Sequence, residues 1–265
     1  MISPNAVALD RIVDLDRFPL GDSAFGDRAK AKLASDGLVV LDGFIRPVAL
    51  AELVVEAKTL RPQAFFSEQR HSVYLEEPQP ELAAEDARSW AITSTKGAIT
   101  TDQIPAHSHL RTIYDSPRFR QFLCQAFGEQ ELFEYADPLS SININYYEQG
   151  QELGWHFDNS SFSITLLTQR CEAGGEFESI PKMRDSAAGD DNYRGVAKLL
   201  ADSGHPSKLV QNQGDLVLFR GRDTFHRVTP VEGDRARILT VFAYNTEPEI
   251  SLSENARKTF FGRQG

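Results

Sequence analysis

Two histidines and one aspartate have the residue types and the spacing of a metal site. His156 and Asp158 stand two positions apart, and side chains at i and i+2 of an extended segment point to the same side. An imidazole and a carboxylate can therefore reach one cation together. A second imidazole is available from His226, which follows a short apolar run. Two imidazoles and one carboxylate on one face leave three coordination positions open, a ligand set typical of non-haem iron.

The surroundings of these residues strengthen the assignment, because the His-x-Asp spacing alone is a weak signal in a chain with 6 histidines. The segment is followed by Gly174-Gly175, by a Gly-Asp turn that opens an apolar strand, by the second histidine, and by Arg237 at the start of a β-branched run. We therefore predict a catalytic metal site whose ligands are His156, Asp158 and His226.

The other histidines carry no comparable pattern. His107 and His109 also stand two positions apart, but they lie in a proline-flanked polar segment without a carboxylate or third histidine in a matching strand context. We interpret this pair as unrelated to the metal. His71 and His205 are expected on the surface.

The elements that must position these residues are predicted from periodicity. Apolar–polar alternation and short apolar runs between glycine turns are typical of strands, and apolar residues at helical spacing are typical of amphipathic helices. Several strands joined by glycine turns favour an antiparallel barrel or jelly roll with a helical N-terminal part, a mainly β fold. The predicted strands cover residues 37–41, 141–147, 162–168, 216–219 and 237–244, and the predicted helices cover residues 47–60, 117–127 and 193–201.

Two long segments fall outside the predicted sheet. Residues 62–105 are polar and irregular and contain several prolines, and residues 181–213 form an insert between strands. Both are long enough to fold over the mouth of a barrel. We predict a single domain over residues 1–265, with 1–138 as helical support and lid region, 139–245 as the jelly-roll core and 246–265 as a C-terminal tail.

Composition limits the class of protein. The chain has 265 residues, of which 41% are hydrophobic, enough to bury a sizeable core. Its net charge is -10 and it has no basic run, so nucleic acid is not an expected partner. Cys124 and Cys171 form no CxxC pair and are expected as buried free thiols rather than as a disulfide or a zinc site. No segment approaches a membrane span and the first residues lack a secretory pattern, so we expect a cytoplasmic location. The oligomeric state stays open.

Residues 139–245 resemble the Fe(II)/2-oxoglutarate dioxygenases of the double-stranded β-helix fold, a cupin-like jelly roll. Within that family the chain is most similar to the bacterial group that acts on free amino acids, which includes the lysine radical halogenases and their hydroxylating relatives. The insert with Asn192-Tyr193 and the run Gly-Asp-Arg-Ala-Arg at 233–237 carry this closer similarity. The most specific segments for the wider family are Gly-Trp-His-Phe-Asp (154–158), Gly-Gly-Glu-Phe-Glu (174–178), Gly-Asp-Leu-Val-Leu-Phe (214–219) and His-Arg-Val-Thr-Pro-Val (226–231). The strand-like segment 36–45 resembles the usual first strand of the family.

The resemblance implies a cofactor set and a reaction. Fe(II) would be held by the three predicted ligands, with 2-oxoglutarate as a chelating cosubstrate and O2 as the oxidant. Succinate and CO2 are released, and an unactivated carbon of the substrate is hydroxylated. In the halogenases a glycine stands at the carboxylate position and opens a site for chloride, whereas this chain has Asp158 there. The expected activity is therefore hydroxylation of a small free amino acid or derivative, while desaturation and ring closure stay open.

The far carboxylate of 2-oxoglutarate requires a cation, and the planar fork of arginine can donate two parallel hydrogen bonds to it. Arg235 and Arg237 are both candidates, and on a strand both would face the same side. We prefer Arg237, because it begins the strand, whereas Arg235 adjoins a Gly-Asp turn and is expected to be exposed. Arg227 is expected on the face opposite to its neighbour His226.

Polar side chains near the predicted metal site are candidates to contact the small molecules. Thr165 and Asn143 are predicted to contact the cosubstrate, and Asn145 shares a strand face with Asn143. An amino-acid substrate also requires a cation for its carboxylate and acceptors for its ammonium. The two lid segments offer such groups in Arg88, Arg184, Glu85, Asp86 and Asp185.

Two other functions stay open on the sequence alone. The substrate of the same chemistry could be a side chain of a protein or peptide, as in prolyl hydroxylases, which would require an open groove. The chain could also be a cupin-like protein that binds a metal or a sugar without redox chemistry. That function would require neither 2-oxoglutarate nor Arg237.

Overall fold

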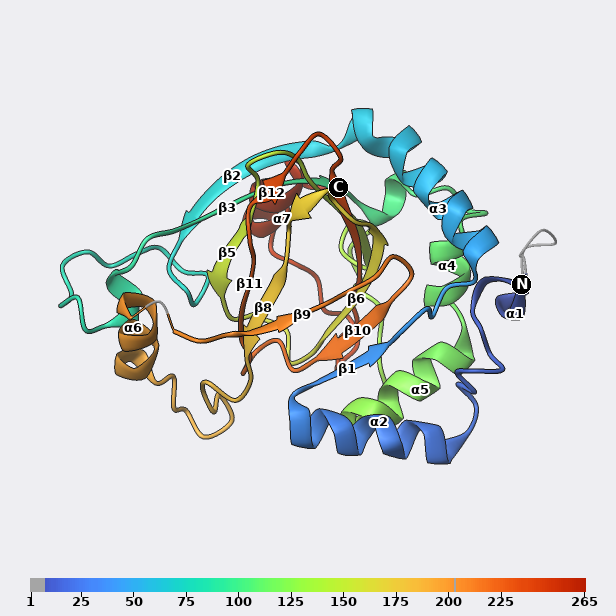
Figure 1. The fold of residues 1–265 in the computed structure, drawn as a ribbon, viewed down its shortest axis with the longest axis horizontal. Coiled ribbons are helices and arrows are strands. Elements are labelled where there is room, and N and C mark those ends of the chain that lie inside the picture. The colour runs from blue at the N-terminus through green and yellow to red at the C-terminus, as the bar shows by residue number, and fades with distance from the viewer. Residues whose placement is uncertain (1–7, 203) are drawn as a thin grey trace.

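One large, curled antiparallel sheet dominates the computed structural model of the chain, which describes residues 8–202 and 204–265 (Figure 1). Among these residues the sheet has 11 strands, in the order β1-β10-β6-β13-β4-β3-β5-β11-β8-β9 with β2 paired to β3, and β7 and β12 form a separate ribbon. The strands are β1 Leu38–Leu41, β2 Phe65–His71, β3 Ile92–Ile99, β4 Ile142–Tyr147, β5 Leu153–His156, β6 Ser163–Gln169, β7 Ala173–Gly174, β8 Phe177–Ile180, β9 Ser207–Leu209, β10 Leu216–Phe219, β11 Phe225–Val228, β12 Val231–Glu232 and β13 Arg237–Phe242.

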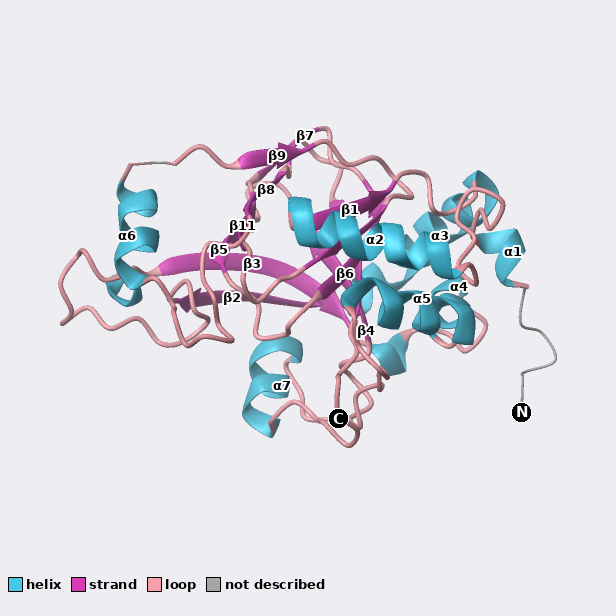
Figure 2. Cartoon of the chain, turned by 90° about the horizontal axis from the view of Figure 1, so that it is seen from below, coloured by secondary structure: helices cyan, strands magenta, loops and turns pink. Residues whose placement is uncertain are grey.

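The helices gather mainly on one side of the sheet. Helices α2 to α5 pack on the outer face of β1, β10, β6, β13 and β4, while α6 lies at the far end and α7 lies against β2 and β3 (Figure 2). In the described residues the helices are α1 Leu9–Ile12, α2 Ser23–Asp36, α3 Pro47–Leu60, α4 His109–Tyr114, α5 Pro117–Phe127, α6 Tyr193–Ala201 and α7 Glu254–Phe261. None of them is long and apolar enough to cross a membrane.

Helix α5 shows why the helical predictions succeeded. The Ser116 hydroxyl accepts a hydrogen bond from the backbone N–H of Phe119, and Pro117 occupies the first turn, where its missing N–H costs nothing. At the other end Gly128 adopts a φ of 80°, a left-handed conformation that ends the helix. The predicted helices 47–60, 117–127 and 193–201 match α3, α5 and α6.

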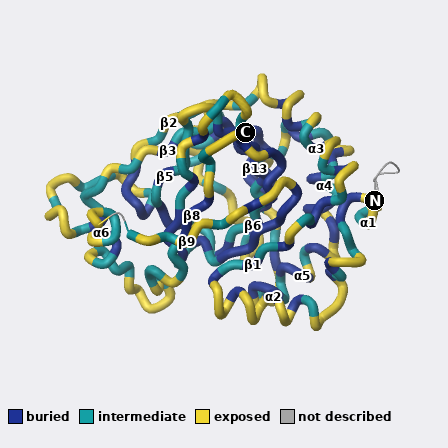
Figure 3. The backbone as a smooth tube through the Cα atoms, in the orientation of Figure 1, coloured by how far each residue is buried: buried dark blue, intermediate teal, exposed yellow. Residues whose placement is uncertain are grey.

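The strand β4 separates the core from an interior cavity. Ile142, Ile144 and Tyr146 belong to the core shared with the helices, and the Tyr146 hydroxyl donates a hydrogen bond of 2.7 Å to the Ala57 carbonyl of α3. The alternate residues of β4 therefore face the other way, into the curled sheet. Figure 3 shows that the strands around this interior are largely buried, whereas the loops near α6 are more exposed.

The prediction of an irregular lid over residues 62–105 was wrong for residues 65–71 and 92–99, which form strands β2 and β3. Strands β2 and β3 pair in one ladder that runs from Phe65 opposite Ala98 to His71 opposite Ile92. The apolar alternation that marks a strand is hidden here, because one face of the ladder lines a cavity and carries polar residues such as Ser94 and Lys96. Only the connection between β2 and β3 is largely irregular.

The remaining predictions of secondary structure agree with the fold within a few residues. The five predicted strands correspond to β1, β4, β6, β10 and β13, and the mainly β class with a helical N-terminal part is confirmed. Strands β5, β8, β9 and β11 and helices α2, α4 and α7 were not predicted. Cys124 and Cys171 are free thiols as expected, and Cys171 is buried, whereas Cys124 is partly exposed.

Candidate metal centre

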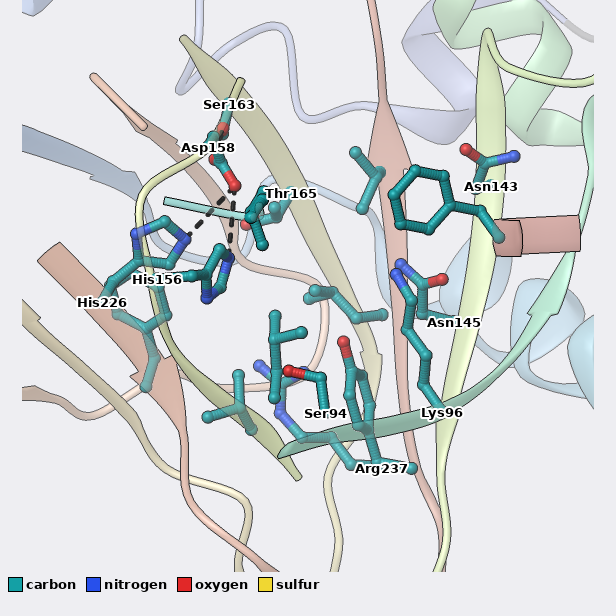
Figure 4. Close-up of a pocket in the computed structure, with 18 of the residues that line it drawn as sticks. Ser94, Lys96, Asn143, Asn145, His156, Asp158, Ser163, Thr165, His226 and Arg237 are labelled. Atoms are coloured by element: carbon teal, nitrogen blue, oxygen red, sulfur yellow. Dashed lines mark hydrogen bonds and ion pairs between the residues drawn. The ribbon is translucent and has the colours of Figure 1, made fainter. Parts of the chain in front are cut away.

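Neighbouring strands bring the predicted metal ligands together. His156 ends β5 and is the direct cross-strand partner of His226 on β11, so the two imidazole rings lie 4.2 Å apart between centroids. Asp158 follows β5 by two residues, and its Oδ1 lies 3.3 Å from His156 Nε2 and 3.6 Å from His226 Nε2 (Figure 4). Within the described chain this is the one cluster of three or more His, Cys, Asp or Glu side chains that a single ion can bridge.

The donor atoms fit a divalent metal ion. Each histidine places its Nδ1 2.8 Å from a backbone carbonyl, His156 on Gly154 and His226 on Thr224, so each Nδ1–H donates and each Nε2 lone pair is free to bind. Adjacent ligands about 2.1 Å from one ion lie about 3 Å apart, close to the separations between Asp158 Oδ1 and the two Nε2 atoms.

Electrostatics keeps these groups in their ligating forms. Burial, followed by the neighbouring His226 ring, lowers the pKa of His156, which favours the neutral imidazole that binds metals. Burial alone would raise the pKa of Asp158, but the two histidines together hold that pKa well below its usual value. The carboxylate is therefore ionised.

The Asp158 carboxylate is held closely between Ser163 and Gly221. The Ser163 hydroxyl donates a hydrogen bond to its Oδ2, and its own backbone N–H donates one of 3.1 Å to the Gly221 carbonyl. A Cβ atom at Gly221 would lie 2.1 Å from Asp158 Oδ2, a distance that real Cβ contacts do not reach. The absence of a side chain at position 221 thus makes room for the carboxylate, while Ser163 leaves its Oδ1 facing the histidines.

The three residues line one side of a cavity of about 270 Å³ inside the curled sheet. Its walls come from β2, β3, β4, β5, β6, β8, β9, β10, β11 and β13, and most of the wall surface is apolar although many of the lining residues are polar. Apolar side chains exclude water and strengthen the few electrostatic contacts made inside. Those from the sheet and its loops are Leu75, Leu153, Phe177, Leu209, Val217, Phe219, Val228, Leu239 and Val241.

Arg237 reaches the same cavity from the first residue of β13. It is 2% exposed, its Nη2 lies 3.4 Å from Gln211 Oε1, and its guanidinium lies 5.7 Å from the centroid of the Tyr147 ring. Its Nη1 and the Gln211 Nε2 are buried donors without a hydrogen-bond partner among the described residues. A carboxylate with two oxygens is the partner that such a pair of donors requires.

The surroundings of Arg237 explain part of the sequence. Burial lowers the pKa of Arg237, and burial raises the pKa of Tyr147 to about 12, so that phenol stays protonated and can donate a hydrogen bond. Gly175, with a φ of 58°, closes the wall, where a Cβ would approach Arg237 Cδ to 3.1 Å. The Gly174-Gly175 pair therefore allows the chain to pass close beside the arginine.

The other arginines near the site lie outside the cavity. Arg235 precedes β13, is exposed, and donates a hydrogen bond of 3.1 Å to the Cys171 carbonyl, so it does not share the face of Arg237 as expected for a continuous strand. Arg227 pairs with Glu178 at 2.7 Å on the face opposite to His226, as predicted.

Thr165, Asn143 and Asn145 all face the cavity. Thr165 and Asn143 stand opposite Val241 on the two strands that flank β13, which places them in one row across the sheet. Asn143 uses its Nδ2 to donate hydrogen bonds to the Leu139 and Ile142 carbonyls. Asn145 is buried at 4% exposure and makes no hydrogen bond through its side chain to another described residue. The predicted contact of Thr165 and Asn143 with a cosubstrate stays a prediction.

The expectation that His71 lies on the surface was wrong. It is 7% exposed, its Nδ1 donates to the Ser72 carbonyl at 2.7 Å, and its Nε2 lies 2.8 Å from the Ser94 hydroxyl. Burial lowers its pKa, so it is a neutral ring in the cavity wall. His205 is exposed as expected. His109 pairs with Glu52 at 2.6 Å away from the cavity, and His107 is exposed.

The charged residues proposed for substrate binding on the two lid segments do not line the cavity. Arg88 pairs with Asp86 at 2.6 Å and stacks on Tyr193, while Arg184 pairs with Asp191 at 3.2 Å. Glu85 and Asp185 are exposed. The β2–β3 connection and the α6 insert pack against each other rather than across the cavity.

Helix α7 contributes to the wall from the C-terminal region. Phe260 and Phe261 line the cavity, and α7 packs on β2 and β3. Beyond the helix, Arg263 forms a two-pronged ion pair of 2.6 and 2.7 Å with Asp102, just after β3. The segment predicted as a tail therefore closes part of the site.

Several cavity residues were not predicted from the sequence. Tyr147 shares the two-residue period of Asn143 and Asn145, and Ser163 shares that of Thr165, so both could have been found from strand alternation. No sequence signal marks Lys96, Gln211 or Gly221, because their strand or loop neighbours become cavity walls only through long-range pairing.

Comparisons with known proteins agree with this geometry. The model of the Halogenase D family matches residues 22–261. The chain is similar in structure to an oxidoreductase of the 2OG-Fe(II) oxygenase family from Burkholderia pseudomallei, with a TM-score of 0.55, 17% identity, and coverage of 87% of this chain and 94% of that one. It is also similar to the non-heme alpha ketoglutarate dependent epimerase SnoN from nogalamycin biosynthesis, with a TM-score of 0.55, 16% identity, and coverage of 84% and 83%.

A third similar structure is a prolyl hydroxylase from Trichoplax adhaerens in complex with a peptide of hypoxia inducible factor. Its TM-score is 0.54 at 11% identity, and the match covers 83% of this chain and 89% of that one. No curated protein sequence matches the chain. At these identities the structural likeness establishes the fold, so the predicted double-stranded β-helix is confirmed. The family match confirms the predicted resemblance to the halogenase group.

Proposed function

Because the chain belongs to the Halogenase D family, we propose that it is an iron(II)- and 2-oxoglutarate-dependent oxygenase that hydroxylates an unactivated carbon of a small free amino acid or close derivative. One observation carries the proposal. A cluster of two imidazoles and a carboxylate stands in the same cavity as a buried arginine with an unpaired N–H donor. The first feature suits iron and the second suits the far carboxylate of the cosubstrate.

Each residue has a distinct role in this proposal. His156, Asp158 and His226 would hold Fe(II), leaving three positions for the keto acid and O2. Arg237, supported by Gln211, would bind and orient the far carboxylate of 2-oxoglutarate. When bound, iron and cosubstrate supply the oxidising chemistry and release succinate and CO2.

The protein controls access to that chemistry. The apolar walls exclude water from the cavity, which strengthens the hydrogen bonds of Arg237 and protects the oxidising centre from side reactions. The Tyr147 phenol, protonated at neutral pH, adds a donor beside the arginine.

Hydroxylation rather than halogenation is supported by Asp158. The halogenases that the chain resembles carry a glycine at this position, which frees a coordination site for chloride. Here the carboxylate is ionised and held by Ser163 in a seat that a side chain at Gly221 would block. Such a carboxylate occupies the position that a halide would need.

A small substrate is supported by the size of the cavity. A volume of about 270 Å³ must hold the cosubstrate and substrate together, which suits a molecule of amino-acid size better than a passing peptide chain. The resemblance to the bacterial group that acts on free amino acids points the same way. A metal- or sugar-binding protein without redox chemistry would have no use for the buried, unpaired Arg237 donor.

The proposal is tested in two steps. Anaerobic titration of the Fe(II) protein with 2-oxoglutarate should produce the weak visible charge-transfer band expected of a keto acid chelated to iron. A panel of free amino acids and matched peptides is then incubated with O2, with succinate and a product sixteen mass units heavier as joint readouts. Turnover confined to peptides would refute the substrate class, and absence of the band would refute the cofactor assignment.

A further inference from the structure

Lys96 is a charged side chain in the cavity to which the proposed chemistry gives no role. It lies in β3, one residue before Gly97, which pairs with Tyr146 of β4. In Figure 4 its side chain runs beside Asn145, on the opposite side of the cavity from His156 and His226. Its ammonium forms no hydrogen bond or ion pair with any residue in the described part of the chain.

A half-buried ammonium without a partner is energetically unfavourable unless a bound ligand supplies the opposite charge. Transfer of a charge out of water is unfavourable when no partner compensates it. Burial lowers the pKa of Lys96, and Asp158, its main opposing charge, is already committed to the histidines. A lysine placed for fold stability alone would turn toward solvent, because its long stem allows it to do so.

The positive charge of Lys96 is not balanced by the other charged groups in the cavity. Of the described residues that line it, the side chains with a fixed charge are Lys96, Asp158 and Arg237. In the proposed complex the charges of Fe(II), Asp158, doubly negative 2-oxoglutarate and Arg237 cancel. The Lys96 charge is then the one that the substrate must balance.

We propose that Lys96, with the Asn145 amide as a second donor, binds the carboxylate of the substrate, and that the far end of the substrate is not cationic. This inference rests on the proposed function and narrows its substrate class. The only carboxylate in the described cavity wall is that of Asp158, so a basic side chain such as that of lysine finds no partner.

The neighbouring asparagine completes the site for an amino acid. Asn143 donates two hydrogen bonds through its Nδ2, to the Leu139 and Ile142 carbonyls, which leaves its Oδ1 as an acceptor for an ammonium. Asn143 and Asn145 are successive residues on one strand face, roughly 7 Å apart along β4. The carboxylate and ammonium of one α-amino acid can therefore meet the two side chains and Lys96.

Three five-carbon probes test the inference on the full chain, loaded anaerobically with Fe(II) and saturating 2-oxoglutarate. Valerate carries the carboxylate, valeramide replaces it with a neutral amide, and 5-aminovalerate adds a cation at the far end. Isothermal titration calorimetry measures their binding. We expect valerate to bind at least tenfold more tightly than valeramide, because a lost charge-assisted hydrogen bond costs roughly tenfold to a hundredfold in affinity. We expect a similar advantage over 5-aminovalerate, because its far ammonium would leave water without an opposite charge to pair with.

Variants assign the effect to Lys96. Lys96→Met should weaken valerate binding by roughly tenfold to a hundredfold without changing the 2-oxoglutarate titration, and Lys96→Arg should restore part of it. Lys30→Met, an exposed lysine on α2, is the matched control and should bind valerate as the wild type does. Melting temperatures check the folding of each variant.

The outcomes separate this inference from the function on which it rests. A wild-type protein that binds 2-oxoglutarate but not valerate, or that binds 5-aminovalerate as well as valerate, overturns the inference alone. Equal valerate binding by wild type and Lys96→Met does the same, as does a weakened 2-oxoglutarate titration in that variant. Failure of the wild type to bind 2-oxoglutarate overturns the proposed function and the inference together.

Discussion

Gly221→Ala is expected to damage the metal site although position 221 supplies no ligand. The added Cβ would lie 2.1 Å from Asp158 Oδ2 and 2.5 Å from the Ser163 hydroxyl, whereas real Cβ contacts stay above 3.0 Å. The carboxylate must therefore retreat by about 1 Å. Its backbone cannot follow freely, because the Asp158 N–H is bonded to the Gly221 carbonyl at 3.1 Å.

The size of the effect follows from the tolerance of metal coordination. Ligand distances vary by about 0.2 Å in functional sites, so a shift of about 1 Å in a carboxylate removes most of its bond to the ion. Loss of the groups that orient a ligand lowers metal affinity by roughly tenfold to a hundredfold. We expect Gly221→Ala to raise the dissociation constant of Fe(II) by that factor, or about 1.4–2.7 kcal/mol.

Anaerobic equilibrium dialysis against Fe(II) measures this constant directly. Gly21→Ala is the matched control, because nothing lies within 4 Å of its added Cβ, and it should bind Fe(II) as the wild type does. A double-mutant cycle with Asp158→Gly then isolates the mechanism. If Gly221 acts only by seating Asp158, Gly221→Ala has no further effect in the Asp158→Gly background. Wild-type affinity in Gly221→Ala, or an equal loss in both backgrounds, would refute the reasoning.

Three further predictions follow from the same geometry. His156→Ala or His226→Ala should abolish succinate formation, because each removes one of three ligands, and full activity in either would contradict the metal assignment. Arg237→Ala should raise the 2-oxoglutarate requirement by roughly tenfold to a hundredfold. Arg235 donates its hydrogen bond to the Cys171 carbonyl outside the cavity, so Arg235→Ala should change the 2-oxoglutarate requirement far less. Kinetic titration with 2-oxoglutarate measures both variants, and a larger effect of Arg235→Ala would show that Arg235 binds the cosubstrate instead of Arg237. Arg263→Ala removes the ion pair with Asp102 and should loosen the packing of α7 on the cavity. Succinate release without substrate should then rise by at most about fivefold, because an exposed ion pair contributes little free energy. The affinity for Fe(II) should stay unchanged.

The sequence predicted those helices and strands that have an apolar face toward the core and a polar face away from it. Helix α5 has a serine cap, a proline in its first turn and a terminal glycine, so its bounds follow from local chemistry. Strand β4 alternates Ile142, Ile144 and Tyr146 with polar residues, and its core face is large and apolar. Both signals are contained in a short window of sequence.

The parts that the sequence did not predict depend on partners far along the chain. Strand β3 buries Ser94 and positions Lys96 toward a cavity, so the alternation that marks a strand carries little hydrophobic contrast. Helix α2 buries only Gly26, Ala29 and Leu33, a stripe too thin to stand out by periodicity. The contact between Gly221 and Asp158 joins residues 63 positions apart, and no local pattern encodes it.

The same distinction applies to the metal site and its surroundings. The spacing of His156 and Asp158 is local, so the ligand pair was visible in the sequence, and the cross-strand pairing of His226 with His156 brings the third ligand to it. The substrate groups were sought among charged residues of the irregular segments, but Arg88 pairs with Asp86 and Arg184 pairs with Asp191, outside the cavity. An unpaired charge is recognisable only after the partners of every other charge are known.

Charge balance also separates the question of reaction type from that of substrate. In the halogenases that the chain resembles, chloride takes the place of the carboxylate, and both carry one negative charge. Exchange of Asp158 for a halide therefore leaves the sum over iron, cosubstrate and Arg237 unchanged. The positive charge of Lys96 therefore needs an anionic partner whether Asp158 or chloride occupies that position. Asp158 thus bears on what is inserted into the substrate, whereas Lys96 bears on which substrate is held, and the two assignments stand or fall on separate measurements.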